Sequence, residues 1–211
     1  MTAPGYFIVV EGPEGAGKST LVAGLAERIK RLGLDAVVVR EPGGTPAAET
    51  IRRVLLDPAV PIQPLAELFL FLAARADLVE GVIRPALAQG RVVLADRFQL
   101  STEAYQISGR GLERSVVLAA NAAATGGLVP DCTLVVDVPS HDGLDRARSR
   151  KEGADRMEQE NAAFHQRVAQ AFARATGAGV SHLDGMMAPA RVLDQAFEVL
   201  RRQNPETFGA T

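Results

Sequence analysis

The stretch Gly12-Pro-Glu-Gly-Ala-Gly-Lys18-Ser19 decides the fold, and it directly follows the apolar run at residues 6–10. It matches G-x-x-x-x-G-K-[ST], a pattern whose glycines let consecutive backbone N–H groups turn inward around phosphate oxygens. A helix that starts at Lys18 would add the positive end of its dipole. A chance glycine-rich turn is the alternative, but the position between a strand and a helix favours a phosphate-binding loop, the P-loop. The motif alone does not distinguish ATPases, GTPases and small-molecule kinases.

The remaining sequence alternates short β-branched runs with longer helical patterns. We expect strands at residues 6–10, 36–39, 92–95, 133–138 and 180–183. Helical patterns cover residues 18–32, 46–56, 64–89, 101–105, 112–125 and 189–202, and an Arg-rich helical stretch runs to residue 150 and resumes after Gly153 as far as residue 175. We expect bends at Gly81 and Pro85, and fraying after Asn204.

This alternation predicts an α/β fold, namely a P-loop three-layer sandwich with helices on both faces of a mostly parallel central sheet of about five strands. No internal repeat, linker or boundary interrupts the 211 residues, so we expect a single domain over residues 1–211. Ligands of such sheets bind beyond the carboxyl ends of the strands. The functional residues should therefore follow the strands.

Composition limits the function classes. The formal net charge is -2 and the hydrophobic fraction 47%, which gives no sign of a general nucleic-acid or membrane surface. The single cysteine, Cys132, cannot form an internal disulfide, so a reducing compartment is expected. We see no signal peptide and no apolar run near the roughly 18 residues of a membrane span. We therefore predict a cytoplasmic protein with no nucleic-acid or membrane partner.

Within the P-loop, the pattern predicts that Lys18 reaches the β- and γ-phosphates and that Ser19 ligates Mg²⁺. A GTPase is disfavoured, because no N/T-K-x-D sequence follows a strand and Asp96 is followed by Arg97 instead of x-x-Gly. A large ATPase machine is disfavoured by the short chain. The predicted triphosphate-binding residues of the loop are Gly12, Pro13, Glu14, Gly15, Ala16, Gly17, Lys18, Ser19 and Thr20.

Four further segments carry chemical side chains. They are Arg40-Glu-Pro-Gly-Gly-Thr45, Phe71-Leu-Ala-Ala-Arg75, Asp96-Arg-Phe-Gln-Leu-Ser-Thr-Glu-Ala-Tyr-Gln106, and Arg146-Ala-Arg-Ser-Arg150 followed by Asp155-Arg-Met-Glu158. Together with the P-loop, in this order and spacing, they resemble bacterial thymidylate kinase over essentially the whole chain. The combination is far more specific than the P-loop alone.

The resemblance assigns several residues to the acceptor, dTMP. It implies that Glu14 meets the 3′-hydroxyl of the sugar. A carboxylate accepts well from a hydroxyl but would repel a phosphate. It also places Pro42 near the base, Arg52 at the acceptor phosphate and Glu11 near Mg²⁺. The competing interpretations are a solvated loop residue for Glu14, a strand-end charge for Glu11 and a solvated helix charge for Arg52.

The base is expected to meet one face of a helix. Phe71 and Arg75 are four residues apart and share that face, so the ring can stack on a pyrimidine while the guanidinium donates to its O4 carbonyl. Such a donor disfavours cytosine, which carries an amino group there. A phenylalanine on an apolar helix is more often core, and only the resemblance reverses that expectation. By resemblance, the base and sugar are also lined by Ser101, Thr102, Tyr105 and Gln106.

Tyr105 is implied to act as a steric filter near the sugar 2′ position, whereas helix capping remains the alternative for Ser101 and Thr102. Arg97 is implied to hold the acceptor phosphate and share charge with the transferring group. Asp96 would orient Mg²⁺ through water or brace Arg97, with a structural ion pair as the alternative. Ile107 and Ser108 replace glycines common in the family, which leaves the contact of Arg110 open.

Arg146, Arg148 and Arg150 open a proposed small helical lid at residues 146–157. A cationic lid over ATP neutralises the transferring group and excludes water. Because the P-loop carries Gly15 where some family members carry arginine, the resemblance implies the lid-arginine type, with Arg150 at the γ-phosphate and Arg146 near adenine. A solvated helix face is the alternative for Arg148.

We therefore predict a thymidylate kinase that uses Mg²⁺ and ATP to convert dTMP to dTDP for dTTP supply. The predicted catalytic residues are Lys18, Asp96, Arg97 and Arg150, and the predicted metal residues, partly through water, are Ser19, Glu11 and Asp96. The resemblance also implies a homodimer, for which residues 65–72 and 112–124 are candidates. The alternatives are another small P-loop kinase with a different acceptor, and a nucleotide-binding regulator without turnover.

Overall fold

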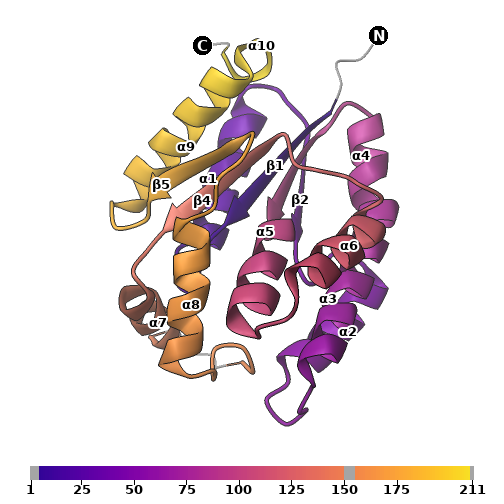
Figure 1. The fold of residues 1–211 in the computed structure, drawn as a ribbon. Coiled ribbons are helices and arrows are strands. Elements are labelled where there is room, and N and C mark those ends of the chain that lie inside the picture. The colour runs from indigo at the N-terminus through magenta and orange to yellow at the C-terminus, as the bar shows by residue number, and fades with distance from the viewer. Residues whose placement is uncertain (1–4, 150–154, 210–211) are drawn as a thin grey trace.

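The computed structural model describes residues 5–149 and 155–209, with Arg148 described by its backbone alone. A five-stranded sheet lies at its centre, with strand order β2-β3-β1-β4-β5, and the four strand pairs in this order are all parallel (Figure 1). The strands in that order are Ala36–Arg40, Val92–Asp96, Tyr6–Glu11, Cys132–Asp137 and Val180–Asp184. The α/β prediction is thus confirmed, and the strands match their predicted positions to within one residue.

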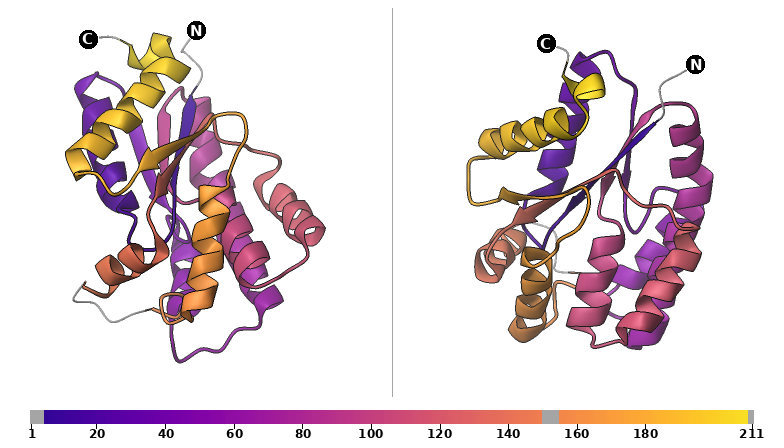
Figure 2. Two further views of the ribbon diagram at one scale, coloured as in Figure 1. Left: turned by 60° about the vertical axis from the view of Figure 1, so that its left-hand side comes forward. Right: turned by 45° about the horizontal axis from the view of Figure 1, so that its top comes forward.

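Helices cover both faces of this sheet, as Figure 2 shows. The helices are α1 Lys18–Arg31, α2 Pro46–Leu56, α3 Pro64–Leu78, α4 Arg84–Ala88, α5 Gln99–Thr102, α6 Arg114–Thr125, α7 Ser140–Arg148, α8 Ala162–Ala173, α9 Pro189–Gln203 and α10 Pro205–Phe208, with π-helical turns η1 Val79–Ile83 and η2 Glu103–Gly109. None of the helices in the described part of the chain is long and apolar enough to cross a membrane.

The alternation of side chains along β1 divides the core in two. Ile8 and Val10 join the core beneath α1 and α9, whereas Phe7 and Val9 join the core beneath α3 and η1. Successive strand residues point to opposite faces, so a strand covered on both sides is apolar throughout. This explains why the central strands are uninterrupted apolar runs instead of alternating ones.

The long helical pattern at residues 64–89 forms a continuous helical stretch of three parts. The α-helix α3 passes into the π-helical turn η1, which contains Gly81, and then into α4, whose second residue is Pro85. The predicted irregularities therefore fall where the hydrogen-bond pattern changes. Further along the chain the prediction was wrong, because residues 155–161 form turns and helix α8 starts only at Ala162. Asn161 caps α8 by accepting from the Phe164 amide at 2.9 Å.

The predicted fraying after Asn204 is also wrong for residues 205–209. The Asn204 side chain accepts from the Thr207 amide at 3.1 Å and caps the short helix α10. Phe208 is completely buried, with its ring centroid 5.3 Å from that of Tyr6 and 6.4 Å from that of Phe197. One aromatic side chain therefore fixes a segment whose polar sequence suggested a loose end.

Replacing this ring should cost much of the stability of the protein. Phe208→Ala is expected to lower the free energy of unfolding by about 3–5 kcal/mol, because it leaves a cavity between β1 and α9. Urea unfolding followed by circular dichroism measures the change. The control, Val129→Ala, alters a side chain that is 66% exposed and should stay within about 0.5 kcal/mol. A loss below about 1 kcal/mol for Phe208→Ala would contradict the packing of Phe208 against Tyr6 and Phe197.

Candidate active site

A cavity of about 400 Å³ lies beyond the carboxyl ends of β1, β2 and β3. The side chains that line it come from the P-loop, α2, α3, the turn after β3, η2 and the start of the lid region. Of the residues predicted to bind ligands, it collects Glu14, Gly15, Gly17, Lys18, Ser19, Thr20, Pro42, Arg52, Phe71, Arg75, Asp96, Arg97, Ser101, Thr102, Tyr105, Gln106 and Arg146. Gly12, Pro13 and Ala16 belong to the loop but not to this lining.

The phosphate end of the cavity is formed by the P-loop. The Lys18 ammonium is buried and donates to the Pro13 carbonyl at 2.7 Å, a contact that holds it across the loop. Burial, followed by the nearby charge of Arg97, lowers the pKa of Lys18 to about 8. Glycine at position 15 is required by geometry, because its φ is +67° and a Cβ there would lie 1.9 Å from the Gly143 carbonyl oxygen of α7. An arginine at this position would not fit without moving α7.

Ser19 and Asp96 meet at the edge of the P-loop. The Ser19 hydroxyl donates to Asp96 Oδ2 at 2.7 Å. A P-loop serine beside an aspartate at the end of a neighbouring strand is the donor set that holds Mg²⁺ in P-loop enzymes. Within residues 5–149 and 155–209, no group of three or more His, Cys, Asp or Glu side chains could hold a metal by itself. The Ser19–Asp96 pair suits Mg²⁺ by its chemistry, because this cation is bound by one or two protein oxygen groups together with phosphates.

Glu11 has a different place from the one predicted. Its side chain is completely buried and does not line the cavity. Oε1 accepts from the amides of Phe98 and Ser101, at 2.9 and 3.0 Å, and Oε2 accepts from the Ser101 hydroxyl at 2.6 Å. Burial raises the pKa of Glu11, against the lowering effect of these hydrogen bonds. The carboxylate therefore fixes the turn after β3, and Glu11 is not placed to bind a metal in the cavity.

Arg97 lies between the P-loop and the opposite wall. Its φ of 75° is unusual for a residue other than glycine and turns the side chain back toward β1. The guanidinium forms an ion pair with Glu14 at 2.9 Å and donates to the Gly12 carbonyl at 3.2 Å and the Ser101 hydroxyl at 3.1 Å. The ion-pair partner of Arg97 is thus Glu14. A positive φ at a residue other than glycine is a strained conformation, and such strain is concentrated at functional sites.

Glu14 is an ionised group within this cluster and not a solvated loop residue. Burial alone would raise its pKa, but the charges of Arg97 and Lys18 outweigh it and lower the pKa to about 2. The Tyr105 hydroxyl donates to Glu14 Oε1 at 2.7 Å, and Arg97 lies over the Tyr105 ring at 5.1 Å. Glu14, Arg97 and Tyr105 therefore fix one another at the middle of the cavity.

The predicted hydrogen bond from Arg75 to a base is not available in this arrangement. Arg75 is 2% exposed, and its five N–H groups all donate within the protein. The acceptors are Glu41 Oε2, which receives two of them, the Thr102 hydroxyl, Asn121 Oδ1 and the Phe98 carbonyl. Arg75 still lines the cavity beside Phe71, but it presents the surface of a fixed guanidinium and no free donor.

Ser101 and Thr102 do not cap a helix. They lie inside α5, whose N-cap position is Phe98, and both side chains are engaged in the buried contacts described above. Gln106 lines the cavity and donates to Glu67 Oε1 at 3.1 Å. The capping alternative is therefore wrong for both hydroxyls, which serve Glu11 and Arg75 instead.

Two further arginines line the cavity. Arg52 of α2 lines it and donates to the Pro42 carbonyl at 2.9 Å. Burial and the nearby Arg40 lower the pKa of Arg52. Arg146 of α7 also lines the cavity and donates to the Gly185 carbonyl at 3.0 Å. Arg150 lies outside the described residues, as does the side chain of Arg148, so their predicted roles remain predictions.

Three buried polar residues near the cavity were absent from the sequence-based assignment. Glu41 and Asn121 hold Arg75, and Glu67 holds Gln106. Asn121 was recognisable as the one polar residue in the apolar run at residues 116–124, and Glu67 as a lone charge between apolar neighbours. Such positions are costly to bury without partners, which is the signal that the sequence offered.

Comparison with known proteins gives a consistent result. The sequence model of the family "Thymidylate kinase" matches residues 10–183. The thymidylate kinase of Deinococcus radiodurans is 49% identical over 168 residues, which cover 80% of this chain and 81% of that protein. That of Synechococcus sp. is 45% identical over 202 residues, covering 94% and 96%. The crystal structure of thymidylate kinase from Ehrlichia chaffeensis superposes with a TM-score of 0.77 at 28% identity and covers 93% of this chain and 99% of that one.

Proposed function

The chain belongs to the thymidylate kinase family, and from this premise we propose that its cavity holds dTMP against the phosphates of Mg-ATP. The reaction of the family transfers a phosphoryl group from ATP to dTMP. One observation carries the assignment to this cavity. Lys18 and Ser19 line one end, Phe71 and Arg75 line another, and Arg97 lines the same space. A donor phosphate and a pyrimidine nucleotide can thus face each other across one guanidinium.

The side chains divide the work of transfer between them. Lys18 and the P-loop amides would hold the β- and γ-phosphates, and Arg52 and Arg97 would hold the acceptor phosphate. An acceptor oxygen then attacks the γ-phosphorus in line, and the ADP oxygen leaves. The chemistry needs positioning and charge neutralisation more than bond-forming groups of the protein. Arg97 can act on both phosphates because Glu14 fixes it between them.

Mg²⁺ belongs to this proposal through Ser19 and Asp96. The serine hydroxyl would be a direct ligand and the aspartate would act through water. When bound, the cation supplies positive charge to the β- and γ-phosphate oxygens. Arg146 would lie near adenine, and the predicted place of Arg150 is the γ-phosphate.

The acceptor base and sugar are assigned to the opposite wall. Phe71 is half-buried in the cavity lining and would stack on thymine. The Thr102 hydroxyl oxygen accepts from Arg75, so its O–H would be the group that donates to the acceptor nucleotide. Tyr105, fixed by its bond to Glu14, would exclude a 2′-hydroxyl, and Glu14 would accept from the 3′-hydroxyl.

We also propose a homodimer in the cytoplasm. Leu65 and Phe69 of α3 are 46% and 53% exposed, and Val116 of α6 is 47% exposed. Helices α3 and α6 pack side by side and lie on the outside of the molecule (Figure 1). Large exposed apolar side chains on neighbouring helices are typical of a subunit interface. The buried free thiol of Cys132 fits a reducing compartment.

The acceptor assignment is tested with a panel of substrates. With ATP and Mg²⁺, we expect ADP formation with dTMP, slower formation with dUMP, and little with dCMP, thymidine or shikimate. Omitting Mg²⁺ or adding excess EDTA should abolish the reaction. A coupled ADP assay measures all of these rates. Absence of phosphoryl transfer to any monophosphate would overturn the proposal, and a preference for thymidine would point to a nucleoside kinase.

Removing the central guanidinium should stop turnover. Arg97→Ala is expected to lower kcat by about 10³, because arginine neutralises charge on the moving phosphoryl group. Circular dichroism should show an unchanged fold. Arg31→Ala, at the exposed end of α1, is the control and should keep full activity. An unchanged kcat/KM for dTMP in Arg97→Ala would refute the role.

Charge on the proposed interface should separate the subunits. Phe69→Glu places a carboxylate on the exposed face of α3 and is expected to shift sedimentation from dimer to monomer. Val129→Glu, in the loop before β4, is the control and should sediment as the unmodified protein. A dimer that persists in Phe69→Glu would place the interface elsewhere.

A further inference from the structure

Glu67 is a buried carboxylate for which the reaction has no direct use. It lies one turn before Phe71 and two turns before Arg75, so the three side chains share the face of α3 that is turned toward the cavity. Phe71 and Arg75 line the cavity, whereas Glu67 does not. Its side chain is 0% exposed. Burying a carboxylate is costly unless hydrogen bonds and ion pairs compensate for the lost water. The contacts of Glu67 therefore indicate its role.

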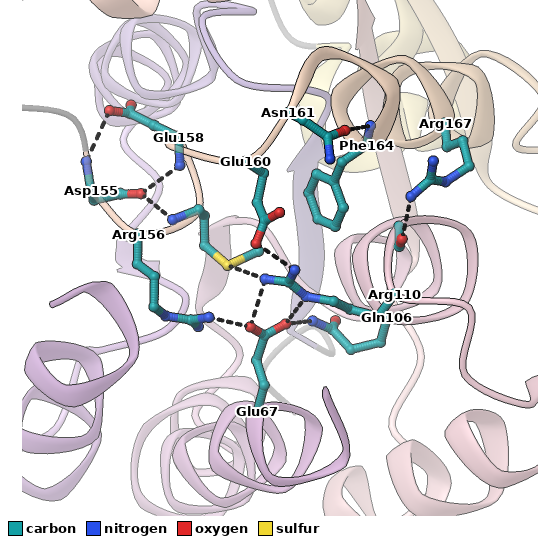
Figure 3. A network of polar contacts seen from close by, with 12 residues as sticks. Glu67, Gln106, Arg110, Asp155, Arg156, Glu158, Glu160, Asn161, Phe164 and Arg167 are labelled. Atoms are coloured by element: carbon teal, nitrogen blue, oxygen red, sulfur yellow. Dashed lines mark hydrogen bonds and ion pairs between the residues drawn. The ribbon is translucent and has the colours of Figure 1, made fainter. Parts of the chain in front are cut away.

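Four donor groups converge on the two oxygens of Glu67 (Figure 3). Oε1 accepts from Gln106 Nε2 at 3.1 Å and from Arg110 Nε at 2.9 Å. Oε2 accepts from Arg110 Nη2 at 2.9 Å and pairs with Arg156 Nη1 at 2.6 Å. Burial raises the pKa of Glu67, but the hydrogen bonds and charges of Arg110 and Arg156 outweigh it and leave the pKa below its usual value. The group is therefore an ionised carboxylate with cations on both sides.

Two of the three donor residues, Gln106 and Arg156, connect Glu67 to the cavity wall. Gln106 is itself a lining residue, and Arg156 stands between the lining residues Asp155 and Met157. The backbone amide of Arg156 donates to the Leu56 carbonyl at 3.1 Å, and its Nε donates to the Leu55 carbonyl at 2.7 Å. These carbonyls end helix α2, which carries Arg52 into the cavity. The Glu67 carboxylate therefore links α3 directly to the turn η2 and to Arg156, and through Arg156 to the end of α2.

Arg110 extends the network toward α8. Its Nη1 pairs with Glu160, and its guanidinium lies 4.7 Å from the ring centroid of Phe164. Among the described residues, the linked ion pairs contain two arginines and two glutamates, whose formal charges balance. Removing the Glu67 carboxylate would take away an ion-pair partner that Arg110 and Arg156 share, and both guanidinium groups are largely buried. A network of this kind is rigid when complete and disrupted when one member is lost.

We propose that Glu67 is a positioning residue for the acceptor, which fixes Gln106, Met157 and the end of α2 around dTMP without touching it. The inference rests on the proposed function, because it takes this side of the cavity as the dTMP side. The P-loop has its own supports, in the Lys18–Pro13 and Ser19–Asp96 contacts. A positioning role therefore predicts weaker dTMP binding with ATP binding preserved, which general loss of structure would not produce.

The test compares Glu67→Gln and Glu67→Asp by steady-state kinetics. Glutamine keeps the shape but replaces an acceptor oxygen by a donor amide, and aspartate keeps the charge but is one methylene shorter. For both we expect the KM for dTMP to rise about tenfold, which corresponds to about 1.4 kcal/mol. The KM for ATP should remain within about twofold, and kcat should fall less than the KM for dTMP rises. Calorimetric titration with dTMP alone should show the same loss of affinity.

The matched control is Glu80→Gln, in the same continuous helical stretch, where the side chain is 68% exposed and pairs with Arg84. It should leave both KM values unchanged. Arg156→Lys keeps the charge but loses the bond to the Leu55 carbonyl, and it should raise the KM for dTMP in the same selective way. If neither Glu67 variant folds, Arg156→Lys decides the question.

An unchanged KM for dTMP in the folded variants would overturn the inference, and so would an equal rise in both KM values. Failure of the unmodified protein to phosphorylate dTMP would instead sink the proposed function. The two proposals are therefore separated by the same set of assays.

Discussion

The ion pair between Glu14 and Arg97 is the interaction on which the rest of the site depends. Glu14 belongs to the P-loop after β1, and Arg97 follows β3, the neighbouring strand. Their 2.9 Å contact joins the P-loop to the proposed acceptor side of the cavity. The positive φ of Arg97 is tolerated because the guanidinium gains Glu14, the Gly12 carbonyl and Ser101 together. Backbone strain of about 1–3 kcal/mol is compensated by a group of charge-assisted hydrogen bonds.

The proposed acceptor wall also depends on buried charges that each have several partners. Arg75 donates all five of its N–H groups, and Glu67 accepts from Gln106 and two arginines. Such pairs add little net stability over apolar residues of similar size, but losing one partner costs several kcal/mol. Their benefit here is fixed geometry, because a guanidinium or carboxylate with every position engaged has a single orientation. A rigid wall is what differential binding of a transition state requires.

Much of this arrangement could be predicted from the sequence. The rest could not, because it depends on contacts between residues that are far apart in the chain. Strand positions follow from apolar periodicity and were predicted to within one residue, and the P-loop carries its geometry in its glycines. Helix positions were predicted less well, because the start of α8 and the presence of α10 were missed. Periodicity also placed Phe71 and Arg75 on one face. It did not reveal which residues that face meets, because Asn121, a partner of Arg75, is 46 residues away in the sequence. The partner of Glu11 was missed for the same reason, since Ser101 is 90 residues away. The burial of Phe208 against Tyr6 was missed in the same way.

Helix α3 connects the proposed subunit interface with the proposed acceptor wall. Leu65 and Phe69 are exposed, whereas Glu67 and Phe71, each two residues further along, turn toward the inside. An offset of two residues rotates a helical position by about 200°, so these two sets occupy opposite faces of one rod. A partner seated on the outer face would restrict the motion of the whole helix, since a helix transmits displacement with little bending. The proposed acceptor wall would then be held on its outer side by the second subunit and on its inner side by Glu67. Dimer formation would thus reduce the conformational freedom that dTMP binding must otherwise remove.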